Sequence, residues 1–363
     1  MRISRRAFVK RSAGVGGVLA YGLTARPARC DEVEWLAEVQ QPPANLTPLD
    51  RPLAPLLVDA SGQSITTMAE WEKRRPELRS AWTKVLGQLE VSRPTPTLTV
   101  LEQDVTAGVR RSFVRYESEP GLPVEGYLLQ PMNLADPVPG FVVLHSTVPY
   151  TIRQPAGLEG PEEKFFGLDL ARKGYVAFCP RCFLWQGDGK YDELVDRFQK
   201  RHPGVTGMAK MLFDAQRAVD VLESLPVVDP SRIGAIGHSL GAKEALYLLA
   251  FDDRVKVAVS SEGGVGIAQS NWNAPWYLGK QVDEPNFPRE HHELAALCAP
   301  RALLVVGGES ADGDRSWSYL QPVLDVYKLY GSTNRLGLYN HRRGHAVPPA
   351  ARVKMFDWLD TYV

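Results

Sequence analysis

Residues 233–246 read IGAIGHSLGAKEAL, and the interpretation of the whole chain starts from this stretch. It contains the pattern G-x-S-x-G, in which Ser239 stands between Gly237 and Gly241. Apolar residues precede the pattern as in a buried strand, and a helical stretch follows it. Serine at such a turn is held in a strained conformation, and the glycines remove side chains that would clash. The stretch therefore predicts a reactive Ser239, with the backbone N–H of Leu240 directed toward developing negative charge.

On both sides of this turn, short apolar runs alternate with helical stretches. Such alternation predicts βαβ units, and hence an α/β fold whose mostly parallel central sheet is flanked by helices. The expected parallel strands are 140–144, 175–178, 233–236, 255–259, 302–306 and 336–339, and the expected helices are 162–173, 205–225, 242–250, 316–330 and 349–362. The runs 98–103, 111–116 and 123–129 alternate apolar and polar residues, which predicts antiparallel strands leading into the parallel sheet.

The region before these strands has a different character. Residues 31–97 are rich in proline and largely irregular, apart from one amphipathic stretch at 67–89. Pro76 lies inside that stretch and is expected to kink the helix or divide it in two. We therefore expect an N-terminal helical extension over 31–97 and a single α/β domain over 98–363.

Several further segments carry a resemblance to a known group of proteins. They are FDAQRAVD at 213–220, VDPSRI at 228–233, APRALLV at 299–305 and the closing Gly344-His345. With residues 237–241 they resemble the dienelactone hydrolase and acetyl xylan esterase branch of the α/β-hydrolase superfamily, over roughly residues 124–363. The resemblance implies the α/β-hydrolase fold and ester hydrolysis, and exported bacterial relatives often cleave acetyl or other esters on plant polysaccharides. Dienelactone hydrolases proper use a cysteine where this chain has Ser239.

A serine nucleophile needs a general base, and in α/β hydrolases the chain order is serine, acid, histidine. The histidines after Ser239 that come into question are His291, His292, His341 and His345. His345 lies between the last strand and the terminal helix, which is where this fold carries its base. We therefore predict His345 as the base, a structural contact for His341, and solvated side chains for His291 and His292.

Four carboxylates are candidates for the acid of the catalytic triad. The loop 307–317 follows the strand before last and is longer than usual in the family. Asp314 is the first choice, because its spacing from the following tryptophan and helix is common for this acid. Asp312, Glu309 and Glu262 are alternatives, the last at the end of the preceding strand, where some members of the fold carry the acid. The acid holds the imidazole tautomer and stabilises the imidazolium.

A second oxyanion donor is expected from the loop after strand 140–144. The backbone N–H of Ser146 or Thr147 is the candidate, and His145 is expected at the wall of the substrate site. Three tryptophans are candidates for stacking on a sugar ring: Trp185, Trp272 and Trp276. The alternative, that these aromatic residues pack as a cover over the sheet, stays open.

The N-terminus reads SRRAFVK at residues 4–10, and an uncharged run of small and apolar residues extends from Ser12 to Ala25. A positive start, a short apolar stretch and small residues indicate a secretory signal peptide, and the paired arginines resemble a twin-arginine signal. We expect a signal peptide over residues 1–30, a periplasmic or extracellular location, and no stable membrane anchor after cleavage.

Composition limits the possible partners. The 363 residues are 44% hydrophobic and 23% charged with zero net charge, so we expect no nucleic-acid partner. No phosphate-binding glycine loop or dinucleotide fingerprint occurs, so no cofactor is expected. Cys179 and Cys182 form a C-x-x-C pair without a second ligand pair, so no metal is expected. The expected partner is a small-molecule or carbohydrate ester.

Three functions fit this pattern. The first is an exported serine ester hydrolase that forms an acyl-enzyme. The second is a serine peptidase resembling the prolyl oligopeptidase group, which the lack of a propeller repeat disfavours. The third is a catalytically silent binding protein on the same fold, which the combination of Ser239, nearby acids and His345 disfavours.

Overall fold

A nine-stranded sheet runs through the protein in the order β1-β2-β3-β5-β4-β6-β7-β8-β9. The structure, a computed structural model, describes residues 32–363, so the predicted signal peptide lies outside the described residues. The strands are β1 (Thr99–Thr106), β2 (Val109–Glu119), β3 (Leu122–Pro131), β4 (Val138–Leu144), β5 (Val176–Pro180), β6 (Val228–His238), β7 (Val255–Ser261), β8 (Ala302–Gly307) and β9 (Leu336–Asn340).

The pairing of these strands confirms the predicted division of the sheet. β1, β2 and β3 form an antiparallel meander, and β3 joins the rest by an antiparallel pairing with β5. All other neighbours, from β5 through β4 to β9, are parallel. The central strands β7 and β8 are almost wholly buried, as parallel strands covered on both faces are.

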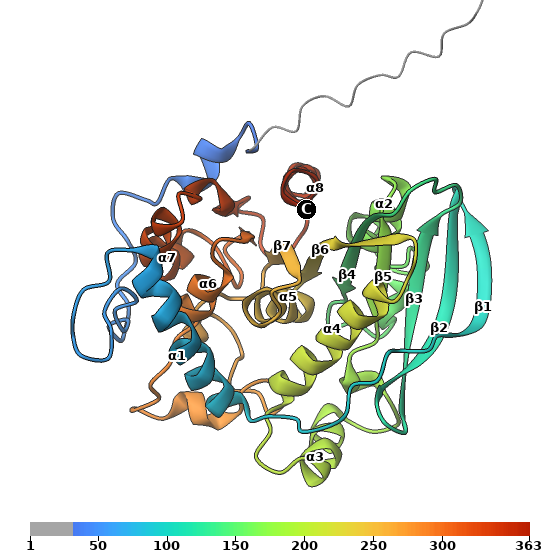
Figure 1. Ribbon diagram of the computed structural model, residues 1–363, viewed down its shortest axis with the longest axis horizontal. Coiled ribbons are helices and arrows are strands. Elements are labelled where there is room, and N and C mark those ends of the chain that lie inside the picture. The colour runs from blue at the N-terminus through green and yellow to red at the C-terminus, as the bar shows by residue number, and fades with distance from the viewer. Residues whose placement is uncertain (1–31) are drawn as a thin grey trace, which may run out of the picture. The chain divides into compact units, whose positions relative to one another are not determined.

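Helices cover the two faces of the sheet over separate apolar clusters. One cluster contains side chains from α1 (Met68–Leu86), α3 (Tyr191–Arg201), α4 (Gly207–Glu223), α5 (Leu240–Phe251), α6 (His292–Cys298) and α7 (Trp317–Leu329). The other contains side chains from α2 (Phe166–Arg172) and α8 (Pro349–Tyr362). In Figure 1, α4 and α5 lie below the central strands and α8 lies above them, on the opposite face of the sheet. This is the α/β-hydrolase architecture that the sequence predicts.

The helices differ from the sequence prediction in three places. α1 is continuous through Pro76, although we expected a kink or a break. Burial of Trp71, Leu78 and Trp82 on one side of α1 offsets the backbone bond that proline cannot make. α3 and α6 were not predicted at all, although α3 has a clear apolar stripe of Leu194, Val195 and Phe198.

The N-terminal extension is packed into the core of the α/β part. Trp82 in α1 is fully buried, and its Nε1 donates to Glu293 in α6 at 2.8 Å. Arg75 and Arg79 bridge from α1 to Asp253 after α5. The extension therefore contributes to the same apolar cluster as α4 to α7.

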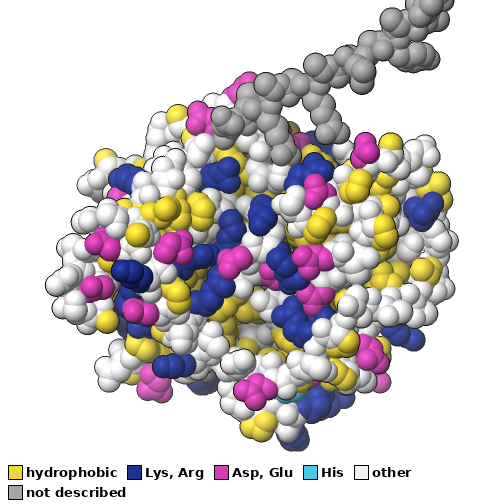
Figure 2. All heavy atoms as spheres, viewed as in Figure 1, with side chains coloured by type: hydrophobic (Ala, Val, Ile, Leu, Met, Phe, Trp, Pro, Cys, Tyr) yellow, Lys and Arg dark blue, Asp and Glu magenta, His cyan; other side chains and the backbone are white. Residues whose placement is uncertain are grey.

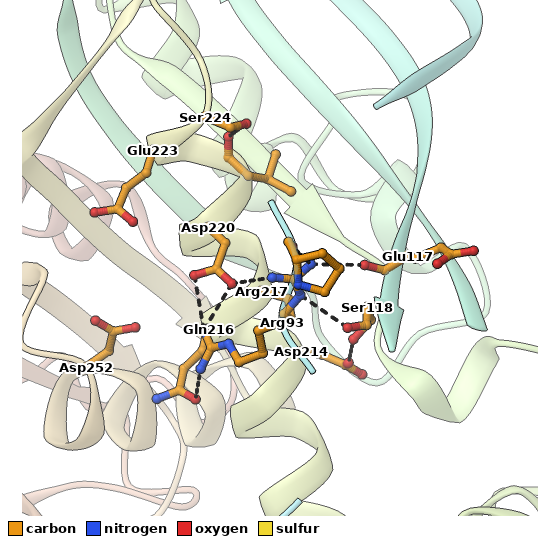
Figure 3. A network of polar contacts seen from close by, with 12 residues as sticks. Arg93, Glu117, Ser118, Asp214, Gln216, Arg217, Asp220, Glu223, Ser224 and Asp252 are labelled. Atoms are coloured by element: carbon orange, nitrogen blue, oxygen red, sulfur yellow. Dashed lines mark hydrogen bonds and ion pairs between the residues drawn. The ribbon is translucent and has the colours of Figure 1, made fainter. Parts of the chain in front are cut away.

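A second set of polar contacts fixes the segment between the extension and β1. Buried Arg217 in α4 donates from Nη2 to the carbonyl of Pro94 at 2.7 Å and from Nε to that of Ser118 at 3.1 Å (Figure 3). Arg93 binds both oxygens of Asp220 at 3.0 Å. The segment 213–220, which carries part of the family resemblance, thus holds the proline-rich linker and the end of β2 on α4.

No helix within residues 32–363 combines the length and the hydropathy that crossing a membrane requires.

Candidate active site

Ser239 occupies the turn between β6 and α5, in the strained conformation expected of this motif. Its φ is 60° and its ψ −115°. Both flanking glycines are sterically required, because a Cβ on Gly237 would lie 2.1 Å from the carbonyl oxygen of Gly241, and one on Gly241 2.2 Å from that of Leu144. The amide of Ser239 donates to the carbonyl of Ser261 at the end of β7 (2.8 Å). The turn is therefore closely packed and locked to the neighbouring strand.

His345 lies on the loop between β9 and α8, beside this turn. Its ring centroid is 4.7 Å from that of His238, the residue before Ser239. His238 is buried, and its Nδ1 lies 3.0 Å from the hydroxyl of Ser261. Burial holds the pKa of His238 well below its ordinary value, with a smaller effect of nearby cationic groups, so its imidazole is neutral at pH 7. The side chain of His345 is 44% exposed, so solvent reaches the site from this side.

The carboxylate that contacts His345, within the described residues, belongs to Glu262. Its Oε2 lies 3.5 Å from Nδ1 of His345, and its side chain is fully buried. Backbone amides of Gly308 and Ala311 donate to the two oxygens of Glu262, the second at 2.6 Å. Burial raises the pKa of Glu262, but the hydrogen bonds from His345 and from these amides outweigh it, so the net pKa lies below the ordinary value. Glu262 is therefore an ionised carboxylate held against the imidazole.

The structure does not bring Asp314, the first choice from the sequence, to His345. Its carboxylate accepts from Asn340 Nδ2 at 2.8 Å and pairs with Arg342 at 2.7 Å, with 39% of the side chain exposed. Glu309 accepts from Asn340 and from the amide of Asp314. The physical reason is that the loop after β8 turns its backbone amides toward Glu262, while these two carboxylates face β9.

Asp312, the second alternative, has a different position again. It is fully buried, and its two oxygens accept from the amides of Gly264 at 2.7 Å and Val265 at 2.8 Å. The hydroxyl of Ser316 donates to it as well. Burial raises the pKa of Asp312, and these hydrogen bonds oppose that effect only in part. Asp312 therefore fixes the loop that follows Glu262.

The other histidines are structural. The Nδ1 of His341 accepts from the amide of Arg343 (3.1 Å), which fits the predicted structural contact. The prediction that His291 and His292 are solvated is wrong, because both side chains are buried in the first turn of α6. The Nε2 of His291 lies 2.8 Å from the hydroxyl of Tyr247. His291 is therefore in the interior, although the sequence around it is polar.

His145 connects the loop after β4 to the segment after β5. Its Nε2 accepts from the amide of Cys182 at 3.1 Å, so its Nδ1 carries the proton and donates to the carbonyl of Ser146 at 2.8 Å. Burial lowers the pKa of His145 to about 4, so the ring is neutral. Both ring nitrogens are occupied, so His145 has no free nitrogen to offer a substrate, and its place at the wall of the substrate site stays a prediction. The loop with Ser146 and Thr147 lies against the start of α5, because a Cβ on Gly241 would come within 3.0 Å of the carbonyl of His145.

The three candidate tryptophans have different environments. Trp272 is 1% exposed and donates to the carbonyl of Gly264 at 2.8 Å, so it packs in the interior and has no face for a sugar. Trp185 and Trp276 are half-buried, and both pack against Tyr191, with ring centroids 4.9 and 5.6 Å away. Trp185 also packs against His145, at 5.0 Å.

Lys243, one turn after Ser239, is a residue that the sequence interpretation missed. Its Nζ donates to the carbonyl of Gly263 and to the hydroxyl of Ser270 at 2.7 Å, and it lies 4.7 Å from the ring centroid of Trp272. Burial lowers the pKa of Lys243 to about 8, against the opposing effect of nearby carboxylates. The sequence signal that could have identified Lys243 is its position one helical turn after Ser239. Lys243 and Asp312 therefore both anchor the loop after Glu262, the lysine through Gly263 and Ser270.

A comparison with family models matches residues 124–289 to the dienelactone hydrolase family. A 4-O-methyl-glucuronoyl methylesterase of Neurospora crassa is 23% identical over 77% of this chain and 73% of its own length. The corresponding enzyme of Cerrena unicolor is 23% identical over 68% of this chain, and this chain spans about half of it, 54%.

Solved structures agree with the fold. A glucuronoyl esterase from Solibacter usitatus superposes with a TM-score of 0.68 at 20% identity, covering 86% of this chain and 98% of that one. One from Teredinibacter turnerae gives a TM-score of 0.66 at 22% identity, covering 85% and 89%. The chain therefore has the α/β-hydrolase fold, and it is similar to the dienelactone hydrolase family over the matched residues, as its motifs indicate.

Proposed function

We propose that this protein is an exported carboxylic ester hydrolase that acts on carbohydrate esters through an acyl-enzyme on Ser239. Ester hydrolysis is supported by the likeness to methylesterases along most of the chain. The observation that carries the catalytic proposal is the contact of His345 Nδ1 with the buried carboxylate of Glu262, beside the strained Ser239 turn.

The proposed triad is Ser239, His345 and Glu262. The free Nε2 of His345 takes the proton of the Ser239 hydroxyl as the oxygen attacks the ester carbonyl. Glu262 fixes the tautomer with the proton on Nδ1, and it stabilises the imidazolium because it stays ionised. His345 then protonates the leaving alcohol, and a water activated by the same imidazole releases the acid from Ser239.

The proposed oxyanion hole consists of the Leu240 amide at the start of α5 and an amide of Ser146 or Thr147. His145 supports it by tying the loop after β4 to Cys182. Such preorganised donors typically contribute about 3 kcal/mol each to lowering the barrier. The carbohydrate part of the substrate is proposed to lie against Trp185 and Trp276, the two half-buried members of the aromatic row through Tyr191.

The test is labelling by a fluorophosphonate probe of the mature chain and of Ser239→Ala, followed by turnover of methyl glucuronate and acetylated xylose. Labelling and turnover by the parent alone are expected, with an unchanged circular dichroism spectrum in the variant. Turnover that survives in Ser239→Ala would overturn the mechanism. Absence of labelling in both proteins would favour the silent binding protein.

Export is proposed from the sequence of residues 1–30, which lie outside the described residues. Replacing the pair Arg5 and Arg6 with lysines is expected to retain the protein in the cytoplasm of a bacterial host with a functional twin-arginine pathway. Periplasmic activity that persists in this variant would contradict that route.

A further inference from the structure

A groove of about 660 Å³ lies at the edge of the sheet where the parallel strands end. Its walls come from β2, the first residues of β3, the segment after β5, α3, and Lys210 at the start of α4. Four arginines line it together with one carboxylate: Arg115, Arg181, Arg197, Arg201 and Glu125. Ligands of α/β sheets bind at this carboxyl edge, which also carries Ser239 and His345.

The positive charge of this groove is only partly compensated. Arg115 and Arg181 share Glu125, at 3.0 and 3.1 Å. Arg197 and Arg201 in α3 are exposed, and among residues 32–363 no carboxylate forms an ion pair with either within 4 Å. The Nη2 of Arg197 donates to the backbone carbonyl of Asp188, which leaves its charge unpaired.

Arginines elsewhere on the protein are mostly paired. Arg254 contacts Asp220, Glu223 and Asp252. On the face in Figure 2, basic and acidic side chains lie intermixed. The groove is therefore distinguished by two arginines without an ion pair, Arg197 and Arg201, on one concave surface. Guanidinium groups bind carboxylates in a two-pronged geometry.

The groove is connected to the proposed oxyanion loop. Trp185 lines the groove and packs against His145. Cys182, directly after the groove residue Arg181, donates its amide to His145 Nε2, and the other ring nitrogen binds Ser146. A chain that lay in the groove would pass Trp185, whose half-buried ring offers an apolar face to a sugar.

We propose that this groove binds the free carboxylates of an acidic polysaccharide whose esterified unit is at Ser239. This inference rests on the proposed function in taking a carbohydrate ester as substrate. Arg197 and Arg201 bind uronate groups distant from the scissile ester, so the preferred substrate is a polyanionic chain rather than a small neutral ester.

The first experiment compares the parent with the double variant Arg197→Gln/Arg201→Gln. The measured quantity is the ratio of kcat/KM for a partly methyl-esterified polygalacturonate to that for methyl glucuronate. This ratio is expected to fall about three- to tenfold, as two exposed charge pairs typically contribute, and mainly through KM. The drop should shrink in about 0.5 M salt, because salt screens exposed charges. The matched control Lys73→Gln/Lys328→Gln removes two exposed charges from α1 and α7 and should leave the ratio unchanged.

The second experiment needs no turnover. Binding of unesterified polygalacturonate is measured by affinity electrophoresis, with a neutral β-glucan as the uncharged ligand and a sulfated glycan as the non-carboxylate anion. Retardation by polygalacturonate that is lost in the double variant supports the groove even if no ester is cleaved, which would refute the proposed function alone. An unchanged ratio together with unchanged binding overturns the groove. Equal retardation by the sulfated glycan would overturn carboxylate recognition.

Discussion

The loops after β7 and β8 stand side by side at the sheet edge, and both carry carboxylates that suit a triad. After β7, Glu262 is buried, accepts hydrogen bonds from three backbone amides of the next loop, and contacts His345. After β8, Asp314 is part-exposed and pairs with Arg342. Chain order permits either residue as the acid, whereas the direction of the neighbouring amides distinguishes them. Donors that converge on a buried oxygen therefore indicate the acid better than its place along the chain.

Backbone conformation separates the two carboxylates in the same way. Glu262 has a φ of +58° directly after β7, which is rare for a residue other than glycine. Its own amide donates to the carbonyl of Val306 at 2.8 Å, so the bond to β8 holds it there. Strain of this kind is found where the surrounding structure fixes a functional side chain.

The largest expected effect comes from Glu262→Gln. The amide keeps the size of the side chain but removes the charge that holds the His345 tautomer, so kcat should fall on the order of 10⁴-fold. The measurement is steady-state hydrolysis of an aryl acetate, with thermal unfolding to verify that the variant folds. Asp314→Asn is the matched comparison and should keep kcat within about threefold. A reversed order of the two losses would restore Asp314 as the acid.

Asp312→Ala should have the next largest effect, on stability. It leaves the amides of Gly264 and Val265 without their buried acceptor, which typically costs about 1–3 kcal/mol per group. Chemical denaturation measures the loss of unfolding free energy. We also expect kcat to fall about tenfold, because the loop after Glu262 loosens. Asp312→Asn retains one acceptor and should recover part of the stability, whereas equal losses in both variants would argue against this role.

Glu290 can be compared with Glu262, because both are buried carboxylates that accept from backbone amides, but only Glu262 contacts a histidine side chain. Burial raises its pKa to about 7, and the amides of His291 and Ile267 oppose this only in part. The folded state therefore retains the proton that the unfolded state releases near pH ~4.3, so stability should fall as pH rises from about 4.5 to 7. Glu290→Gln should remove up to about 3 kcal/mol of this fall. Parallel curves of unfolding free energy against pH for the two proteins would refute the assignment.

The smallest effect should come from Arg342→Gln. It breaks the pair with Asp314, in which 69% of the arginine side chain and 39% of the aspartate side chain are exposed. Exposed pairs contribute about 0.2–1 kcal/mol, so the melting temperature should change little. A large loss of activity in this variant, with the fold intact, would mean that the pair of Asp314 and Arg342 also contributes to catalysis.

The sequence was sufficient for features that depend on local pattern. The strand-to-helix turn at Ser239, the parallel strands and the helix of α8 at 349–362 all follow from spacing that neighbouring residues determine. The loop position of His345 follows from the same pattern, because it lies between the last strand and the last helix.

The remaining features depend on contacts between distant segments. Trp272 and Trp276 are four residues apart in one loop, yet one is interior and the other half-buried, and no periodicity in the loop distinguishes them. Likewise His291 and His292 look polar in sequence, but Trp82 of α1 and Tyr247 of α5 pack on His291, and the Nε2 of His292 lies 2.9 Å from the carbonyl oxygen of Ala54. The choice of Glu262 required knowing where the amides of the loop after β8 point.

The linker contacts of Arg217 have a consequence for shortening the chain. A protein that began at β1, where composition places the boundary, would lose the Pro94 carbonyl that Arg217 binds and the α1 tryptophans that cover α6. Its surface would then expose the apolar side of α6 and leave a buried guanidinium short of an acceptor. The segment before β1 therefore covers part of the hydrophobic core. Its removal would yield an aggregating protein rather than a minimal enzyme.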